Sequence, residues 1–242
     1  MLDARTAAWP DVKAAIERDC VAVIAFGAQE QHGPHAPLAT DTIMASGLAA
    51  RLAEKMDALL LPPIPYGEAW NNSRFPGTVS ISAETAQALI TDIAISLKNT
   101  GVKALIVVNG HFGNRAPIAQ ACRKMQEKHS FPLMQLDYPG LEKLAAEICE
   151  SKPAKYGLFH ADEVETSIVL ALEPDTVKME RAVAEYPDFP ANFLFEPVYL
   201  DSFNQSGVFG DPRPATAEKG ERLLDGLTNE ALKSIDLFLS RI

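Results

Sequence analysis

Four short apolar runs, none of which alternates with polar residues, constrain the fold of this chain most strongly. They cover residues 21–26, 58–61, 104–108 and 132–136. A strand that is apolar at every position is typical of a parallel sheet covered on both faces. Helical patterns separate these runs, at residues 42–56, 83–98 and 116–129. We therefore predict an α/β fold of three layers, with a mostly parallel central sheet flanked by helices.

The remaining segments extend this organisation. Ser82 is the expected N-cap of the second of these helices and Gly101 its expected end. Further helical patterns cover residues 141–151, 162–172 and 216–241. The stretch 187–214 is rich in Pro, Asn, Phe and Gly without a period, so we expect irregular structure whose aromatic residues cover a pocket or form a subunit contact. Since no repeat or linker divides the chain, we predict a single domain over residues 1–242.

Charge and cysteine content narrow the class of function. The 32 acidic residues outnumber the 22 basic ones, for a net charge of −10, which argues against nucleic acid and against an anionic membrane surface as partners. Three widely separated cysteines do not indicate a disulfide framework. There is no secretory signal at the N-terminus and no apolar run of about 18 residues. We predict a cytoplasmic protein that acts on a small molecule.

The loop after the first apolar run is dense in groups that bind metals. Glu30 and His32 are two residues apart, so in an extended backbone their side chains leave the same face. Pro34 and Pro37 block a helix and stiffen the path to Asp41. A rigid loop that offers carboxylate oxygens and imidazole nitrogens suits a divalent metal ion.

A second polar cluster follows the third apolar run and contains His111, with Gly110 and Gly113 beside it. These glycines allow a sharp turn and a close approach of the backbone to a ligand. Both clusters follow predicted strands, and ligands of open parallel sheets bind beyond the carboxyl ends of the strands. We therefore expect the two clusters to converge.

The third cluster opens the predicted helix at 162–172. His160 precedes this helix, and Asp162 and Glu163 occupy its first turn. Carboxylates in a first turn are also favoured by the helix dipole alone, so by themselves these acids do not define a site.

Taken in order, the three clusters resemble the creatininase (creatinine amidohydrolase) family. Phe75-Pro76-Gly77-Thr78 and two late motifs, at 207–212 and 215–220, also match, so the resemblance extends from about Val21 to Glu221. It implies an α/β fold and a site for two divalent metal ions, Zn, Mn or Fe(II), that hydrolyses C–N bonds of cyclic amides or formamides. It also implies a homo-oligomer, commonly a hexamer.

The resemblance also implies roles for individual residues. Glu30 and His111 match the ligands of one metal, His32 matches a ligand of the other, and Asp41 matches the carboxylate that bridges them. Such a carboxylate can hold two metals at the roughly 3.5–4 Å spacing of binuclear hydrolases. His160 is the expected catalytic residue, which holds the substrate or protonates the departing nitrogen.

The sequence departs from the creatinine-hydrolysing members at one ligand. Those members carry a metal-binding Glu two residues after the His that matches His111, where this chain has Gly113. We expect Glu163 to supply the missing ligand, and Glu165 is the competing candidate.

The pocket also departs from that pattern. Tyr156 and Phe112 stand where creatinine-hydrolysing members place Trp and Tyr, so we expect both to bind substrate but to select a different ring. A lactam, imide or ureide is therefore favoured over creatinine. The alternatives are a formamide hydrolase or a cofactor-maturation peptidase of the same family and, from another class, a non-catalytic metal-binding homologue.

Overall fold

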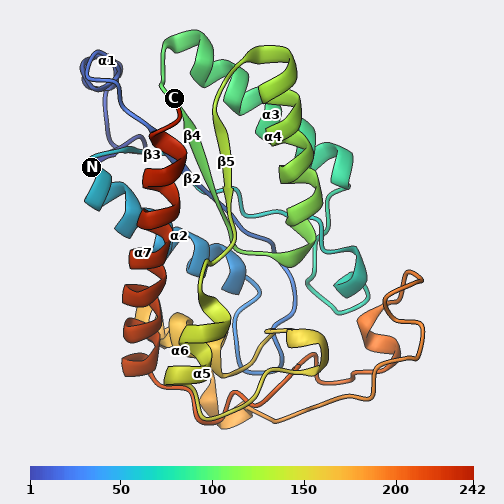
Figure 1. Cartoon of the computed structure of the whole chain (residues 1–242). Coiled ribbons are helices and arrows are strands. Elements are labelled where there is room, and N and C mark those ends of the chain that lie inside the picture. The colour runs from blue at the N-terminus through green and yellow to red at the C-terminus, as the bar shows by residue number, and fades with distance from the viewer.

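The computed structural model describes all 242 residues, and its centre is a five-stranded parallel sheet (Figure 1). The strands are β1 (Leu2–Asp3), β2 (Ala22–Phe26), β3 (Leu59–Leu60), β4 (Leu105–Asn109) and β5 (Leu133–Leu136). Their order across the sheet is β1-β3-β2-β4-β5, and every pairing is parallel. The longest pairing joins β2 to β4, from Ala22 opposite Leu105 to Phe26 opposite Asn109. The loops that leave β2 and β4 therefore start side by side.

Seven α-helices surround this sheet on both faces. They are α1 (Trp9–Ile16), α2 (Thr40–Met56), α3 (Ala83–Thr100), α4 (Arg115–His129), α5 (Leu141–Ile148), α6 (Glu163–Leu172) and α7 (Ala217–Leu239). The apolar residues of α3 and α4 pack in one core cluster, and those of α2, α5, α6 and α7 pack in the other. Figure 1 shows α3 and α4 on one side of the sheet and α2 and α7 on the other. The predicted three-layer α/β fold is confirmed.

Strand β2 shows why the predicted strands lack alternation. Val23 and Ala25 face the core formed with α2, α6 and α7, whereas Ala22, Ile24 and Phe26 face the core formed with α3 and α4. All five residues of the strand are buried. Because helices cover both faces, neither face of the strand carries polar residues.

The helix ends follow local chemistry. The Ser82 hydroxyl accepts a hydrogen bond from the Thr85 amide (3.1 Å), and Gly101 ends α3 with a φ of 96°, so both predictions are confirmed. Helix α5 ends at Ile148 rather than at the predicted residue 151. The amides of Glu150 and Ser151 donate to the Glu163 carboxylate and do not continue the helix.

Two elements at the N-terminus were not predicted. Helix α1 spans only eight residues, and of these only Ala15 is buried, so it lacks the apolar stripe on which a helix prediction depends. Strand β1 has two residues and exists only because its backbone pairs with β3. Neither element is distinguishable from a loop in the sequence.

The stretch 187–214 is irregular, as predicted, and forms an arm that extends from the body of the molecule (Figure 1). Its aromatic residues Phe189, Phe193, Phe203 and Phe209 contact one another, with ring centroids 4.9–6.0 Å apart. This aromatic cluster stabilises a segment that has almost no regular secondary structure.

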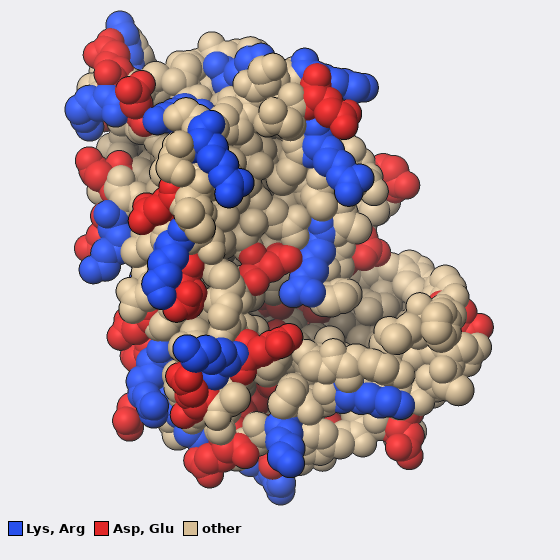
Figure 2. All heavy atoms as spheres, viewed as in Figure 1, with Lys and Arg blue, Asp and Glu red and all other residues tan.

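The surface agrees with the charge balance of the sequence. Figure 2 shows acidic and basic side chains mixed over the viewed face, with no continuous basic area. None of the helices combines the length and the apolar composition needed to cross a membrane.

Candidate metal centre

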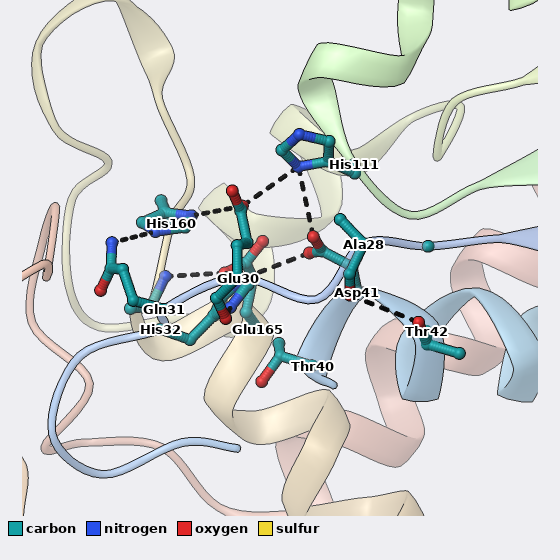
Figure 3. Close-up of polar contacts among 12 residues, drawn as sticks. Ala28, Glu30, Gln31, His32, Thr40, Asp41, Thr42, His111, His160 and Glu165 are labelled. Carbon is teal, nitrogen blue, oxygen red and sulfur yellow. Dashed lines mark hydrogen bonds and ion pairs between the residues drawn. The ribbon is translucent and has the colours of Figure 1, made fainter. Parts of the chain in front are cut away.

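Six ionisable side chains meet at the carboxyl edge of the sheet (Figure 3). Each lies on a segment that follows a strand or lies at the start of a helix: the loop after β2, the first turn of α2, the second residue after β4 and the start of α6. All of them are buried, with at most 9% of the residue exposed: Glu30, His32, Asp41, His111, His160 and Glu165. The convergence of the two loops after β2 and β4 follows from the parallel pairing of these strands.

The cluster contains two sets of donor atoms that share Asp41. In the first, His111 Nδ1 lies 3.1 Å from Glu30 Oε1 and 3.2 Å from Asp41 Oδ2. In the second, His32 Nε2 lies 3.1 Å from Asp41 Oδ1 and 3.5 Å from Glu165 Oε2. Each set has an imidazole nitrogen and two carboxylate oxygens within reach of one cation. Asp41 contributes one oxygen to each set, which is the geometry of a carboxylate that bridges two metals.

Hydrogen bonds to the backbone orient both imidazoles. His111 Nε2 donates to the Glu68 carbonyl (2.7 Å), and His32 Nδ1 donates to the Glu30 carbonyl (3.1 Å). The opposite nitrogen of each ring therefore faces the carboxylates. Metal-binding histidines are held in this way, by a hydrogen bond from the nitrogen that does not bind the metal. His32 Nε2 and Asp41 Oδ2 have no hydrogen-bond partner although they are buried, so the residues present fit a pair of divalent ions.

Burial and the charges of neighbouring side chains shift the pKa of every group in the cluster. Burial opposes a charge on His32, but the carboxylates of Asp41 and Glu165 outweigh burial and raise its pKa to about 10. Glu30 and Asp41 likewise outweigh burial and raise the pKa of His111 well above its usual value. Burial raises the pKa of Glu165 to about 8 against the opposing charge of His32. Without metal, protons therefore balance the negative charge that divalent cations would balance.

The structure places Glu165, the competing candidate, among the donor atoms of the cluster, and it does not place Glu163 there. The Glu163 carboxylate accepts hydrogen bonds from the Ser151 amide (2.6 Å) and from Lys219 Nζ (2.6 Å), so it faces α7. Two residues along an α-helix are separated by about 200° around its axis. Glu165 consequently faces the cluster while Glu163 faces away from it. Asp162, which precedes them, caps α6 through the amides of Val164 and Glu165 (3.0 and 3.2 Å).

His160 lies at the edge of the cluster, and its proton is placed by Gln31. The Gln31 side-chain amide nitrogen lies 2.8 Å from His160 Nε2 and also donates to Asn72 Oδ1 (3.0 Å) and to the backbone carbonyl of Gly207 (3.2 Å). Because this nitrogen is a donor, His160 Nε2 accepts and Nδ1 carries the hydrogen, 3.8 Å from Glu30 Oε1. Burial and the charge of His32 lower the pKa of His160 to about 4. His160 is thus a neutral hydrogen-bond donor towards the cluster.

Gln31 and Asn72 are site residues that the sequence analysis missed. Besides the contacts above, Asn72 Nδ2 donates to Glu30 Oε2 (2.8 Å), so it holds this carboxylate in place. Gln31 lies between Glu30 and His32 in the sequence, and only this position could have indicated that it contacts the site. Asn72 comes from a distant loop, and only the folded chain places it beside Glu30.

Packing accounts for the glycine at position 113. A Cβ atom at Gly113 would lie 2.0 Å from the Glu68 carbonyl oxygen and 2.6 Å from His111 Nε2. The carbonyl that orients His111 can therefore approach only because residue 113 has no side chain. A glutamate at this position is incompatible with the observed path of the backbone.

The two aromatic residues expected to bind substrate lie at the surface. Phe112 is 65% exposed, with the Arg115 guanidinium 4.5 Å from the centre of its ring. Tyr156 is 50% exposed and packs against Phe189 and Phe193 of the aromatic cluster, with centroids 5.4 and 5.9 Å away. Their role in substrate binding stays a prediction.

Two characterised relatives are similar to this chain in sequence. The creatinine amidohydrolase of Pseudomonas putida is 30% identical over 90% of this chain and 89% of its own length. The mycofactocin precursor peptide peptidase of Mycolicibacterium smegmatis is 31% identical over 86% of this chain and 81% of its own length.

Solved structures agree with these relatives. A creatininase crystal structure superposes with a TM-score of 0.86, at 29% identity and with 97% of this chain and 96% of that chain covered. A mutant creatininase described as Zn-Zn type gives a TM-score of 0.85, at 27% identity and with 96% of both chains covered. The family model for creatininase, described as creatinine amidohydrolase, matches residues 5–235. The chain therefore belongs to the creatininase family and is a hydrolase that acts on C–N bonds.

Proposed function

We propose that this protein is a binuclear, metal-dependent amidohydrolase that opens a cyclic amide other than creatinine, such as a lactam, an imide or a ureide. Its metal ligands are Glu30, His32, Asp41, His111 and Glu165. The observation that carries the proposal is the sharing of Asp41 between two sets of buried donor atoms. Oxygen and imidazole ligands of this kind suit Zn, Mn and Fe(II).

The bound ions would supply Lewis acidity towards the amide carbonyl and would lower the pKa of water. The protein's part is to orient the reactants. Asn72 and the Glu68 carbonyl hold Glu30 and His111, so the ligands do not reorganise when the ions bind. Burial of all five ligands excludes bulk water, which strengthens every electrostatic interaction in the site.

His160 completes the site as a donor to the substrate. Of the two roles expected from the sequence, holding the substrate fits better than protonating the departing nitrogen, because a pKa of about 4 leaves this imidazole neutral near pH 7. Its Nδ1–H faces the cluster and would hydrogen-bond the amide as it is attacked. Phe112 and Tyr156 would form the aromatic wall of the pocket.

The peptidase relative favours a second candidate function. That relative is as similar to this chain as the amidohydrolase is. The alternative substrate class is therefore an open-chain amide, either a formamide or a short peptide. Ring opening consumes water without a second product, deformylation releases formate, and peptidase action releases an amino acid or short peptide. A product assay on the metal-loaded protein distinguishes the three.

Several properties of the whole molecule belong to the same proposal. We place the complete site in one domain over residues 1–242, in a cytoplasmic homo-oligomer, with a hexamer favoured. The exposed side chains of Leu194 and Phe195 in the arm (62% and 86%) suit a contact with another subunit.

Metal content per chain tests the proposal most directly. We expect close to two ions in the protein purified without chelator and a loss of both in Asp41→Ala, since Asp41 belongs to both sets of ligands. The measurement is plasma mass spectrometry. One ion or none after reconstitution with Zn or Mn would exclude the binuclear centre and favour a non-catalytic homologue.

A further inference from the structure

The motif at residues 207–212 contributes no ligand to the metal centre, yet its backbone contacts the site. The Gly207 carbonyl accepts a hydrogen bond from the Gln31 side-chain nitrogen (3.2 Å). The Phe209 amide donates to the His160 carbonyl (3.0 Å). Gln31 and His160 in turn contact each other through their side chains (2.8 Å; Figure 3). One short turn of the arm therefore touches both members of the pair that places the proton of His160.

The orientation of the Gln31 side-chain amide is fixed by its other neighbours. Its Oε1 accepts from the Gly33 backbone amide (2.9 Å). Its Nε2, which contacts His160, also faces Asn72 Oδ1 (3.0 Å) and the Gly207 carbonyl oxygen (3.2 Å). A reversed amide would bring its oxygen against these two acceptors and would turn its NH2 group towards the Gly33 N–H. The contacts therefore favour the orientation in which His160 Nε2 accepts.

The approach of the arm to Gln31 depends on glycine at position 207. Gly207 has a φ of 78°, in the left-handed region that favours glycine. An added Cβ atom would lie 1.7 Å from Gln31 Oε1 and 2.4 Å from Gln31 Cδ. Because both distances are far below van der Waals contact, a larger residue would displace the Gln31 amide from His160.

Asn204 holds the turn in this position from inside. Its side chain is fully buried, its Oδ1 accepts from the Gly207 amide (2.6 Å), and its Nδ2 donates to the Val208 carbonyl (2.6 Å). These two hydrogen bonds fix the backbone on either side of the Gly207 carbonyl. That carbonyl does not serve the turn itself, because it accepts from Gln31, which lies 176 residues away in the sequence.

We propose that Gly207 and Asn204 are positioning residues of the hydrolytic site, which hold the Gln31 amide against His160 so that His160 presents Nδ1–H to the substrate. This inference rests on the proposed function, in which His160 donates to the amide. With the other tautomer, a bare Nδ1 would face the site, and a bare nitrogen can only accept. The arm would therefore contribute to substrate binding without touching the metal ligands.

The test compares Gly207→Ala with Gly140→Ala. Gly140 has nearly the same φ (82°), and an added Cβ there meets the flexible side chain of Glu230 (3.0 Å), so this control has the same backbone strain without a contact to Gln31. Solid-state nitrogen-15 NMR of the Zn-loaded, histidine-labelled proteins measures the tautomer, and His160→Gln identifies the signals of His160. The ratio of Nδ1–H to Nε2–H should fall roughly 2- to 10-fold in Gly207→Ala, the worth of one hydrogen bond, and should match the wild type in Gly140→Ala.

Asn204→Ala is a second variant, which removes both side-chain hydrogen bonds to the turn without adding atoms. The tautomer ratio should shift in the same direction, and the metal content of all variants should match that of the wild type. The proposal would be overturned by a wild-type His160 that carries its hydrogen on Nε2, by an unchanged ratio in folded Gly207→Ala or Asn204→Ala, or by an equal shift in Gly140→Ala. Because the tautomer is measured without turnover, a failure of the proposed reaction would be recognised separately.

Discussion

The different positions of Glu163 and Glu165 on α6 lead to the most specific prediction. Both are glutamates in the first turn of α6, and Glu→Gln replaces each carboxyl group by an amide without a change in size. Glu163 forms a structural ion pair with Lys219, whereas Glu165 lies among the donor atoms of the cluster. We therefore expect Glu163→Gln to lower stability and Glu165→Gln to lower metal content.

The size of the first effect follows from burial. The side chain of Glu163 is 0% exposed and that of Lys219 is 13% exposed, and removing one partner of a buried pair costs about 3–5 kcal/mol. Lys219 keeps a contact with the exposed Glu150 (2.7 Å), so the lower end, about 3 kcal/mol, is expected. For a protein of this length that corresponds to a Tm lower by roughly 6–12 °C.

Glu165→Gln should have the opposite profile. In the metal-free protein at pH 7 the raised pKa of Glu165, about 8, keeps its carboxyl group protonated, so glutamine replaces a neutral group and we expect a Tm within about 3 °C of the wild type. Loss of a charged ligand should weaken the binding of the ion held by His32, Asp41 and Glu165 by at least about 100-fold. This is more than the loss of affinity expected when a hydrogen bond to a metal ligand is removed. Scanning calorimetry after chelation and plasma mass spectrometry after reconstitution measure the two effects. A Glu163→Gln protein that loses one ion while Glu165→Gln retains both would refute this account of α6.

Three further predictions concern the geometry and the protons of the site. Gly113→Ala should displace the Glu68 carbonyl, because the added Cβ would lie 2.0 Å from that oxygen. We expect the free energy of unfolding to fall by about 1–3 kcal/mol and metal binding through His111 to weaken, as measured by calorimetry and metal analysis. Unchanged values would contradict the packing role of Gly113. Loading two ions at pH 7 should release about three protons, one each from His32, His111 and Glu165, whose pKa values are all raised, so metal affinity should rise between about pH 6 and pH 8. Titrations in buffers of different ionisation enthalpy count these protons, and a release close to zero would contradict the assignment. Since the folded-state pKa of His32 is raised from 6.5 to about 10, its stabilisation of the metal-free fold is fully present below the lower value and is lost as pH rises towards the higher one.

The three-layer fold could be predicted from the sequence because it depends on local hydrophobic patterns. Runs such as 21–26 and 104–108 are apolar throughout, and only burial on both faces explains such a run next to capped helices. Glu30, His32, Asp41 and His111 were identified on the same basis, since their loops follow predicted strands. Helix α1 and strand β1 were missed because they depend on contacts with the rest of the chain.

The three-dimensional structure was needed wherever the direction of a side chain decided its role. The sequence by itself determined the α/β architecture and most of the polar groups that meet at the carboxyl edge of the sheet, because hydrophobic patterning and strand order act through short segments. Only the tertiary structure showed that Glu165 rather than Glu163 enters the cluster, since the choice depends on the rotation of α6 and on Lys219 from α7. Likewise, Gly113 is accounted for only by the approach of the Glu68 carbonyl, and Asn72 reaches Glu30 only because the fold brings two distant segments together.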